Sequence, residues 1–180
     1  EFRRLGAVVL DADRAGHDVL RLPEVMQSVR QHFGDQVFDS NGQVDRRALG
    51  QLVFGDDAQA SSNLRRLEEI THPPIGERLA AQVQAAAAGG AAAVILDAPV
   101  MLKAGWDRLC DKIVYIEAAD EVRLERARAR GWSDQEFRRR EAAQESLDSK
   151  RSRSDAIIDN SRSADSTRVQ VERLWQSLFP

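Results

Sequence analysis

The sequence predicts an α/β protein in which helices cover both sides of a parallel sheet. The first observation is that its short apolar runs, such as Val8-Val9-Leu10 and Val94-Ile95-Leu96, lack the alternation of a one-faced strand, which is typical of strands buried in a parallel sheet. The second is that helical patterns separate these runs along the chain. Strands that alternate with helices indicate a three-layer α/β/α arrangement, which we expect to form a single domain over residues 1–180.

The expected strands are rich in Val, Ile and Leu, and a carboxylate follows or ends each of them. They comprise residues 7–10, 93–97, 112–117 and 155–159. Because these runs are apolar throughout, we expect the strands to be buried on both faces.

Residues 14–88, between the first and second strands, have helical patterns. Pro23 opens a helix that Gly34 ends, and Asp45 is placed to cap the next helix. Because proline disfavours helical backbone at the preceding residue, we expect a longer helix to break at His72-Pro73-Pro74. The block is therefore expected to be a helical insertion on one side of the sheet.

Capping signals divide the C-terminal part of the chain in the same way. Asp120 is placed to cap one helix, and Ser133 with Glu136 forms a capping-box pattern for another. Apolar residues from Val171 to Leu178 indicate a last amphipathic helix.

Charge and composition exclude some classes of protein. The net charge of -3 is not that of a nucleic-acid-binding protein, and no apolar run approaches the ~20 residues that span a bilayer. Cys110 is the only cysteine, so no disulfide can form within the chain and a reducing compartment is expected. We therefore expect a cytoplasmic protein without nucleic-acid or membrane partners, and the pattern indicates no particular oligomeric state.

Carboxylates occur where the first two strands should end. Asp11 and Asp13 follow the first strand, and Asp97 ends the second. Ligands of open α/β sheets bind beyond the carboxyl ends of the strands, where a carboxylate can hold Mg²⁺ or accept a proton from a hydroxyl group. The alternative is that Asp11 or Asp13 only caps the helix that begins near Ala12.

Arginines are concentrated between Arg123 and Arg153. Their permanently charged, fork-shaped guanidinium groups suit a local anion site. The alternative is that Arg138, Arg139 and Arg140 form a solvated face of a helix.

Ordered motifs run through nearly the whole chain. They are Leu5-Gly6-Ala7-Val8-Val9-Leu10-Asp11-Ala12-Asp13, Asp45-Arg46-Arg47-Ala48-Leu49 with Val53-Phe54, Ile70-Thr71-His72-Pro73, Arg140-Glu141-Ala142-Ala143-Gln144, and Lys150-Arg151 with Ser154-Asp155-Ala156-Ile157-Ile158-Asp159-Asn160. In this order and at these spacings they resemble the dephospho-coenzyme A kinases. The resemblance implies a P-loop kinase-like fold with a coenzyme-A-binding helical subdomain at 14–88 and a helical lid at 131–154.

The resemblance also implies a reaction, in which ATP phosphorylates the 3′-hydroxyl of dephospho-coenzyme A with the help of Mg²⁺. Asp13 and Arg140 would be the catalytic residues. A carboxylate is too weak a base to deprotonate a ribose hydroxyl outright, so Asp13 would orient this hydroxyl and accept its proton late, while Arg140 contacts the transferred phosphate. Asp13 would also help to hold Mg²⁺ through water. Asp97, which the resemblance does not single out, lies where P-loop kinases often place a second carboxylate near Mg²⁺.

The other expected site residues are, for the substrate, Asp11, His17, His72 and Gln144 and, for ATP, Arg140 and Asn160. For Asn160 the alternative is a turn-forming role. For His72 the alternative is that the His-Pro pair only shapes the helical block.

Two features depart from the family pattern. The printed sequence contains no Gly-x-x-x-x-Gly-Lys-Ser/Thr loop, which the family carries just before the segment that starts at Leu5. We therefore expect the natural chain to begin further upstream, with a strand and this loop, and we expect little ATP turnover from residues 1–180 alone. Lys103 stands where the family usually has a glutamate, and the residues alone offer no physical account of this exchange.

Two other functions stay open on the sequence alone. A homologue without the phosphate loop could be a non-catalytic binding or assembly module, and a related kinase could act on another nucleotide or metabolite. The helical insertion and the His72-Pro73 element favour the coenzyme A branch.

Overall fold

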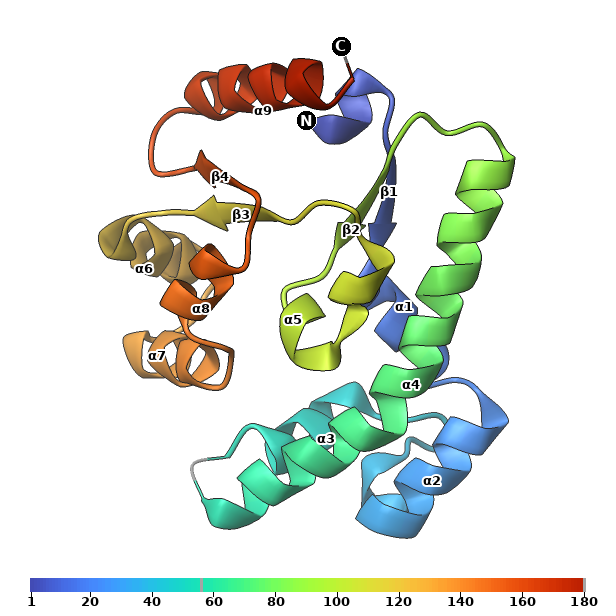
Figure 1. Cartoon of the computed structure of the whole chain (residues 1–180). Helices are drawn as coiled ribbons and strands as arrows, with labels where there is room; N and C mark the ends of the chain where they lie inside the picture. Colours follow the sequence, from blue (N-terminus) through green and yellow to red (C-terminus); the bar gives the residue numbers. More distant parts are fainter. Residues whose placement is uncertain (56, 180) are drawn as a thin grey trace. The chain divides into compact units, whose positions relative to one another are not determined.

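The computed structural model describes residues 1–55 and 57–179 (Figure 1). The chain forms two compact units. One contains Glu1–Val9, Gly90–Ile95 and the chain from Pro99 onward, and the other contains Leu10–Gly89 with Leu96–Ala98. Because the first two strands run from one unit into the other, each unit takes part of both strands.

The second unit is built mainly from helices that follow the first strand. Its elements are the end of β1 (Val8–Asp11), α1 (Ala12–Val19), α2 (Pro23–Phe33), the 3₁₀ helix η2 (Asp35–Val37), α3 (Arg46–Val53), α4 (Ala58–Ala88) and the end of β2 (Val94–Asp97). The long helix α4 contacts α1, α2 and α3. Val19, Val29 and Leu79 are completely buried in this unit.

α1 and α4 approach closely at Gly16. A Cβ atom at this position would lie 3.4 Å from the Cδ1 atom of Ile75, and the Arg78 guanidinium binds the Asp18 carboxylate at 2.8 Å. The helix that follows β1 is therefore fixed to α4 by close packing and by an ion pair.

α4 continues through His72-Pro73-Pro74, so the predicted break is wrong. A proline inside a helix removes a backbone hydrogen bond and bends the helix, but packing can hold the helical backbone on both sides of it. Here Thr71, Ile75 and Leu79 are buried at successive turns of α4. The burial of this side outweighs the local preference, and Figure 1 shows a bent, continuous helix.

The first unit contains the remaining helices and strands. They are the 3₁₀ helix η1 (Phe2–Leu5), α5 (Met101–Ala104), the 3₁₀ helix η3 (Trp106–Leu109), β3 (Val114–Glu117), α6 (Asp120–Ala129), α7 (Asp134–Ala142), α8 (Leu147–Ser152), β4 (Ala156–Asp159) and α9 (Ala164–Leu178). α5 and η3 had no counterpart among the predicted elements.

β3 and β4 pair in parallel, with Val114 opposite Ala156 and Glu117 opposite Asp159. The prediction that the strands are buried on both faces is wrong for most of their residues. Ile158 is only 1% exposed, whereas Ile116 is 50% exposed. In the described part of the chain each strand has a single hydrogen-bonded neighbour, so fewer side chains cover its faces than in a wide sheet.

Two of the predicted helix caps are confirmed. Asp45 Oδ1 accepts a hydrogen bond from the N–H of Arg47 at 2.9 Å, and Ser133 Oγ accepts one from the N–H of Glu136 at 3.1 Å. Each cap satisfies a backbone donor that a helix start leaves unpaired.

The predicted cap at Asp120 is wrong. Ala119 is the N-cap residue of α6, and no side chain caps this helix. Asp120 lies one residue further on, where its carboxylate binds the guanidinium groups of Arg123 and Arg138. The Asp120 side chain therefore forms ion pairs within α6 and with α7, and it does not cap the helix.

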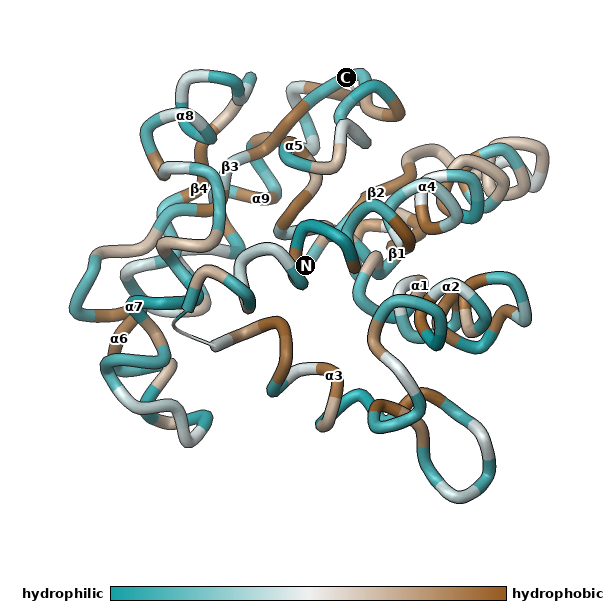
Figure 2. Tube along the Cα trace, turned by 90° about the horizontal axis from the view of Figure 1, so that it is seen from below, coloured by the Kyte–Doolittle hydropathy of each residue, from teal (hydrophilic) through white to brown (hydrophobic). Residues whose placement is uncertain are grey.

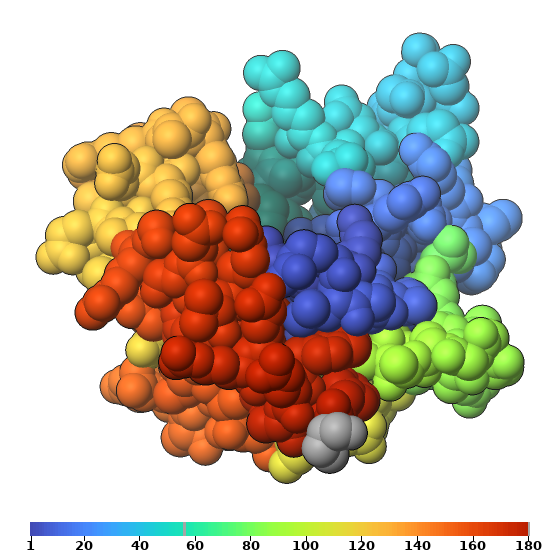
Figure 3. Space-filling model, turned by 90° about the horizontal axis from the view of Figure 1, so that it is seen from above, coloured from blue at the N-terminus to red at the C-terminus, as the bar shows by residue number. Residues whose placement is uncertain are grey.

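Aromatic contacts join the first residues of the chain to α9. The ring centroids of Phe2 and Trp175 lie 6.5 Å apart, and those of Trp175 and Phe179 lie 4.6 Å apart. Figure 3 shows α9, in red, beside the blue N-terminal segment.

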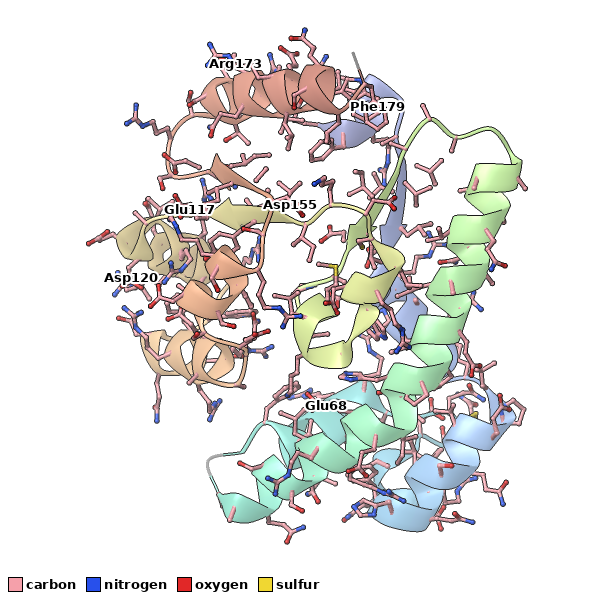
Figure 4. All side chains as sticks on the ribbon, in the orientation of Figure 1. Glu68, Glu117, Asp120, Asp155, Arg173 and Phe179 are labelled. Atoms are coloured by element: carbon pink, nitrogen blue, oxygen red, sulfur yellow. The ribbon has the colours of Figure 1, made fainter. Side chains whose placement is uncertain are left out.

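Asp155, labelled in Figure 4, connects the chain before β4 to the start of β3. Its Oδ1 atom accepts from Lys112 Nζ at 2.9 Å, and its Oδ2 atom accepts from the N–H of Ile113 at 2.8 Å. The hydrogen bond from Lys112 and then that from Ile113 lower the pKa of the Asp155 carboxyl group.

These bonds predict a pH-dependent contribution to stability. A lowered pKa in the folded state stabilises the fold above the ordinary pKa of a carboxyl group, and the stabilisation is lost as the pH falls through the lowered value. Asp155→Asn should therefore lower the melting temperature by a few degrees at neutral pH, and the difference should shrink below about pH 4. Thermal unfolding followed by circular dichroism, with Asp165→Asn as a surface control, would contradict this if the loss were the same at every pH.

Candidate functional site

Asp11 joins the end of β1 to the start of α1. It is the N-cap residue of α1, and its Oδ1 atom accepts a hydrogen bond from the N–H of Arg14 at 3.0 Å. Asp11 therefore does cap α1. Asp13 lies in the first turn of the helix and takes no part in the cap.

Asp13 and His17 share an exposed face of α1. They are four residues apart, which places them on the same side of the helix, and both are exposed. Ala15 and Val19 are buried on another side of α1. The helix therefore presents a carboxylate, followed one turn later by an imidazole, away from its packed side.

Asp97 ends β2 and is exposed. β2 pairs with β1, and the N–H of Val8 donates to the carbonyl oxygen of Ala93 at 3.0 Å. Figure 1 shows β1 and β2 pointing the same way, so Asp97 and Asp11 end at the same edge of the pair.

The carboxylates at this edge fit the chemistry of a Mg²⁺ site. Mg²⁺ prefers oxygen ligands and usually binds one or two carboxylates together with water and substrate phosphates. Asp13 and Asp97 offer such oxygens in one unit. Over residues 1–55 and 57–179 no cluster of three or more His, Cys, Asp or Glu side chains is arranged to hold a metal ion.

His72 lies in α4, half-buried between the buried Thr71 and the exposed Pro73. Because α4 is continuous here, the His-Pro pair does not end a helix. The pair lies inside α4, in the unit that also carries Asp13.

Arg140 is held by other residues of its own segment. Its Nε and Nη2 atoms donate to Glu136 Oε1 at 3.1 and 2.8 Å. Its guanidinium carbon lies 4.4 Å from the centroid of the Trp132 ring, a distance at which cation and ring attract each other. Glu136 therefore turns toward Arg140 and does not complete the reciprocal half of the capping box with Ser133.

Gln144 follows α7 and contacts a lysine. Its Oε1 atom accepts from Lys150 Nζ at 2.6 Å, and burial lowers the pKa of the Lys150 ammonium group. Both residues line a small pocket with Lys103, the residue that departs from the family pattern. A nearby anion would stabilise the charged form of Lys150.

Asn160 lies directly after β4 and is half-buried. Its N–H donates to the carbonyl oxygen of Glu117 at 2.8 Å, and its Oδ1 atom accepts from Thr167 Oγ1 at 3.0 Å. In the turn at this point the accepting side chain is Asp159, whose Oδ1 atom binds the N–H of Ser161 at 2.8 Å. The side-chain amide of Asn160 is thus oriented by Thr167 of α9. Asp159, and not Asn160, accepts the hydrogen bond that stabilises the turn.

The two units divide the predicted site residues between them. The second unit holds Asp11, Asp13, His17, His72 and Asp97, and the first holds Arg140, Gln144 and Asn160. Contacts to these residues also come from side chains that the sequence did not single out as site residues, namely Trp132, Glu136, Lys150 and Thr167. Of these, the four-residue spacing from Glu136 to Arg140 is a signal that the sequence does contain.

Carboxylates beyond parallel strands, together with guanidinium groups on short helices, are the means by which α/β enzymes orient a hydroxyl group and neutralise a phosphate. The fold places the chain in the α/β class, to which the P-loop kinases belong.

A family model described as "Dephospho-CoA kinase" matches residues 1–166. The chain is also 41% identical to a dephospho-CoA kinase of Symbiobacterium thermophilum over 98% of this chain and 73% of the relative. The chain belongs to the dephospho-CoA kinase family. Members of this family are phosphotransferases that catalyse the last step of coenzyme A biosynthesis with ATP as substrate.

Solved structures share the fold of this chain. The crystal structure of TT1252 from Thermus thermophilus is 27% identical and has a TM-score of 0.79, over 99% of this chain and 88% of that chain. A dephospho-CoA kinase from Campylobacter jejuni has the same fold, with a TM-score of 0.69 at 23% identity, over 98% of this chain and 87% of that one. Among the described residues, none of the helices combines the length and apolar character required to cross a membrane.

The geometry of the β1–α1 junction predicts different effects for its two carboxylates. Asp11→Ala removes the cap and should lower the free energy of unfolding by about 0.5–2 kcal/mol. Asp13→Ala should change it by less than about 0.5 kcal/mol, because this side chain lies outside the cap and on the surface. Urea unfolding measures both values, and equal losses would contradict the assignment of the cap to Asp11.

Proposed function

We propose that the protein transfers the terminal phosphoryl group of ATP to the 3′-hydroxyl of dephospho-coenzyme A, giving coenzyme A and ADP. The observation that carries this proposal is the division of roles at the end of β1. Asp11 makes the helix cap, which leaves Asp13 exposed in the first turn of α1. An exposed carboxylate at this edge suits an acceptor hydroxyl and the family supplies the reaction.

Asp13 acts on the acceptor. Its carboxylate accepts the hydrogen bond of the 3′-hydroxyl group, aims the oxygen at the phosphorus atom and takes the proton late in the transfer. Asp11, His17 and His72 contribute to substrate binding from the same unit. In this proposal residues 14–88 form the substrate-binding subdomain of a single kinase domain.

Asp13 and Asp97 would hold Mg²⁺, partly through water. When bound there, Mg²⁺ would supply positive charge that neutralises the phosphate oxygens of ATP. The proposal places the reaction in the cytoplasm.

Arg140 acts on the phosphate. In the proposed lid, residues 131–154, its guanidinium group leaves Glu136 and contacts the phosphoryl group as negative charge spreads over the transferring oxygens. Gln144 contacts the substrate, and Asn160 offers its amide to the adenine of ATP.

The direct test is an assay of the full-length enzyme with ATP, Mg²⁺ and dephospho-coenzyme A. We expect coenzyme A and ADP to form in equal amounts at ~1–100 per second. Free adenosine and other ribonucleosides serve as alternative acceptors. Preference for one of them would assign a different kinase activity, and binding without turnover would assign a non-catalytic module.

Replacing Asp13 separates the catalytic role from the structural one. Asp13→Asn keeps the size of the side chain, so the melting temperature should hardly change. Loss of the proton acceptor should lower kcat by ~100-fold or more. An unchanged kcat would remove Asp13 from the catalytic residues.

Arg140→Ala should lower kcat much more than it raises the KM for dephospho-coenzyme A, because the arginine contacts charge that develops in the transition state. Steady-state kinetics with each substrate varied in turn measure this difference. If only KM changes, Arg140 binds a substrate and is not a catalytic residue.

A further inference from the structure

The helix that carries Arg140 is held to α6 by an alternating set of charges, which we call the α6–α7 clamp. It consists of Asp120 and Arg123 on α6 and Arg138 and Glu141 on α7. Arg138 forms a two-pronged contact with Asp120, through Nη1 at 2.6 Å and Nη2 at 2.5 Å. Figure 4 labels Asp120.

The four charges form one connected network, because each arginine binds both carboxylates. Arg123 binds Asp120 at 2.9 Å and Glu141 at 2.7 Å, and Arg138 also binds Glu141 at 3.2 Å. The contact with Arg138 is the main cause that lowers the pKa of the Asp120 carboxyl group. Arg123 and Glu141 are only 25% and 27% exposed, so these two charges are partly shielded from water and salt.

Little else within the first unit holds α7 by apolar packing. Figure 2 colours most of this helix as hydrophilic, and Phe137 is its one buried residue in the described chain. A second two-pronged pair, Arg128 with Asp134, ties the start of α7 at 2.7 and 2.5 Å. Charge pairs therefore fix the position of α7 together with the buried Phe137.

The clamp and Arg140 lie on different faces of α7. Residues two apart on a helix are rotated by about 200° from each other, so Arg138 points to α6 while Arg140 points nearly the opposite way. Arg140 accordingly contacts Glu136 and Trp132, which are not members of the clamp. A change in the clamp would move Arg140 without altering the side chains of Glu136 and Trp132, which contact it.

The start of α6 is tied in turn to the end of β4. The N–H of Ala119 donates to Ser161 Oγ at 2.9 Å, one residue after Asn160, whose own N–H binds Glu117 at 2.8 Å. Hydrogen bonds and ion pairs thus run from Asn160 and Ser161 through the start of α6 to Arg138.

We propose that Asp120 and Arg138 are positioning residues of the kinase reaction, which hold Arg140 at a fixed place relative to the adenine-binding end of β4. This proposal rests on the function proposed above for Arg140 and Asn160. Neither residue of the pair touches a substrate. They act through the backbone of α7, where a misplacement of about 1 Å in a catalytic group can cost up to a hundredfold in rate.

The test is a double-mutant cycle in the full-length enzyme with Asp120→Asn, Arg138→Gln and both together. Each single variant should lower kcat about tenfold and change the KM for dephospho-coenzyme A less than twofold, since substrate contacts remain. The double variant should be little slower than the singles, because the contact between Asp120 and Arg138 is lost in every case. Arg138→Lys, which keeps the charge without the fork, should fall between the wild type and Arg138→Gln.

Glu172→Gln is the matched control. It removes the carboxylate that pairs with Arg4, a contact between η1 and α9 that involves neither α6 nor α7. It should leave kcat unchanged. A merely structural role for Asp120 and Arg138 would lower the melting temperature and leave kcat at 25 °C as it is, and this result, or single effects that multiply in the double variant, would overturn the proposal.

Amide hydrogen exchange gives a readout that does not depend on turnover. Asp120→Asn and Arg138→Gln should speed exchange in α7 but not in α9, while Glu172→Gln should leave α7 unchanged. If the wild-type enzyme does not phosphorylate dephospho-coenzyme A, the proposed function fails by that assay, and unchanged exchange in α7 then also overturns the clamp.

Discussion

The junction between β1 and α1 depends on one hydrogen bond, from the N–H of Arg14 to the Asp11 carboxylate. A strand that leads directly into a helix leaves backbone donors at the helix start without partners, and the residue at the cap can satisfy them. Because Asp11 makes the cap, Asp13 is not needed for it and is exposed to solvent in the first turn. The proposed acceptor site therefore exists because two neighbouring carboxylates divide the structural and the chemical roles.

Several arginines of the first unit form ion pairs with carboxylates of the same unit. Arg151 contacts Glu117, and Arg153 contacts Asp107. Exposed pairs of this kind contribute little each, about 0–1 kcal/mol, so they can be exchanged for contacts with a phosphate at low cost. The contact of Arg140 with Glu136 belongs to this exchangeable group.

Sequence reasoning was accurate where a residue acts on its immediate neighbours. The caps at Asp45 and Ser133 follow from side chains that reach the next turn of the same helix, and the fold class follows from the alternation of strand and helix patterns. It failed at Asp120 and at His72-Pro73-Pro74. In both cases a distant element decided the outcome, an arginine of α7 in the first and the buried side of α4 in the second.

The sequence by itself determined the fold class, the family and the residue types at the proposed site, because these are carried by local patterns and by ordered motifs such as Arg140 with Gln144. The tertiary structure alone decided which carboxylate caps α1, which groups hold Arg140, and that α7 is fixed to α6 by charge pairs. These choices depend on side chains from separate segments meeting in space. A contact between residues 18 positions apart, such as Asp120 and Arg138, leaves no period or spacing in the sequence that would reveal it.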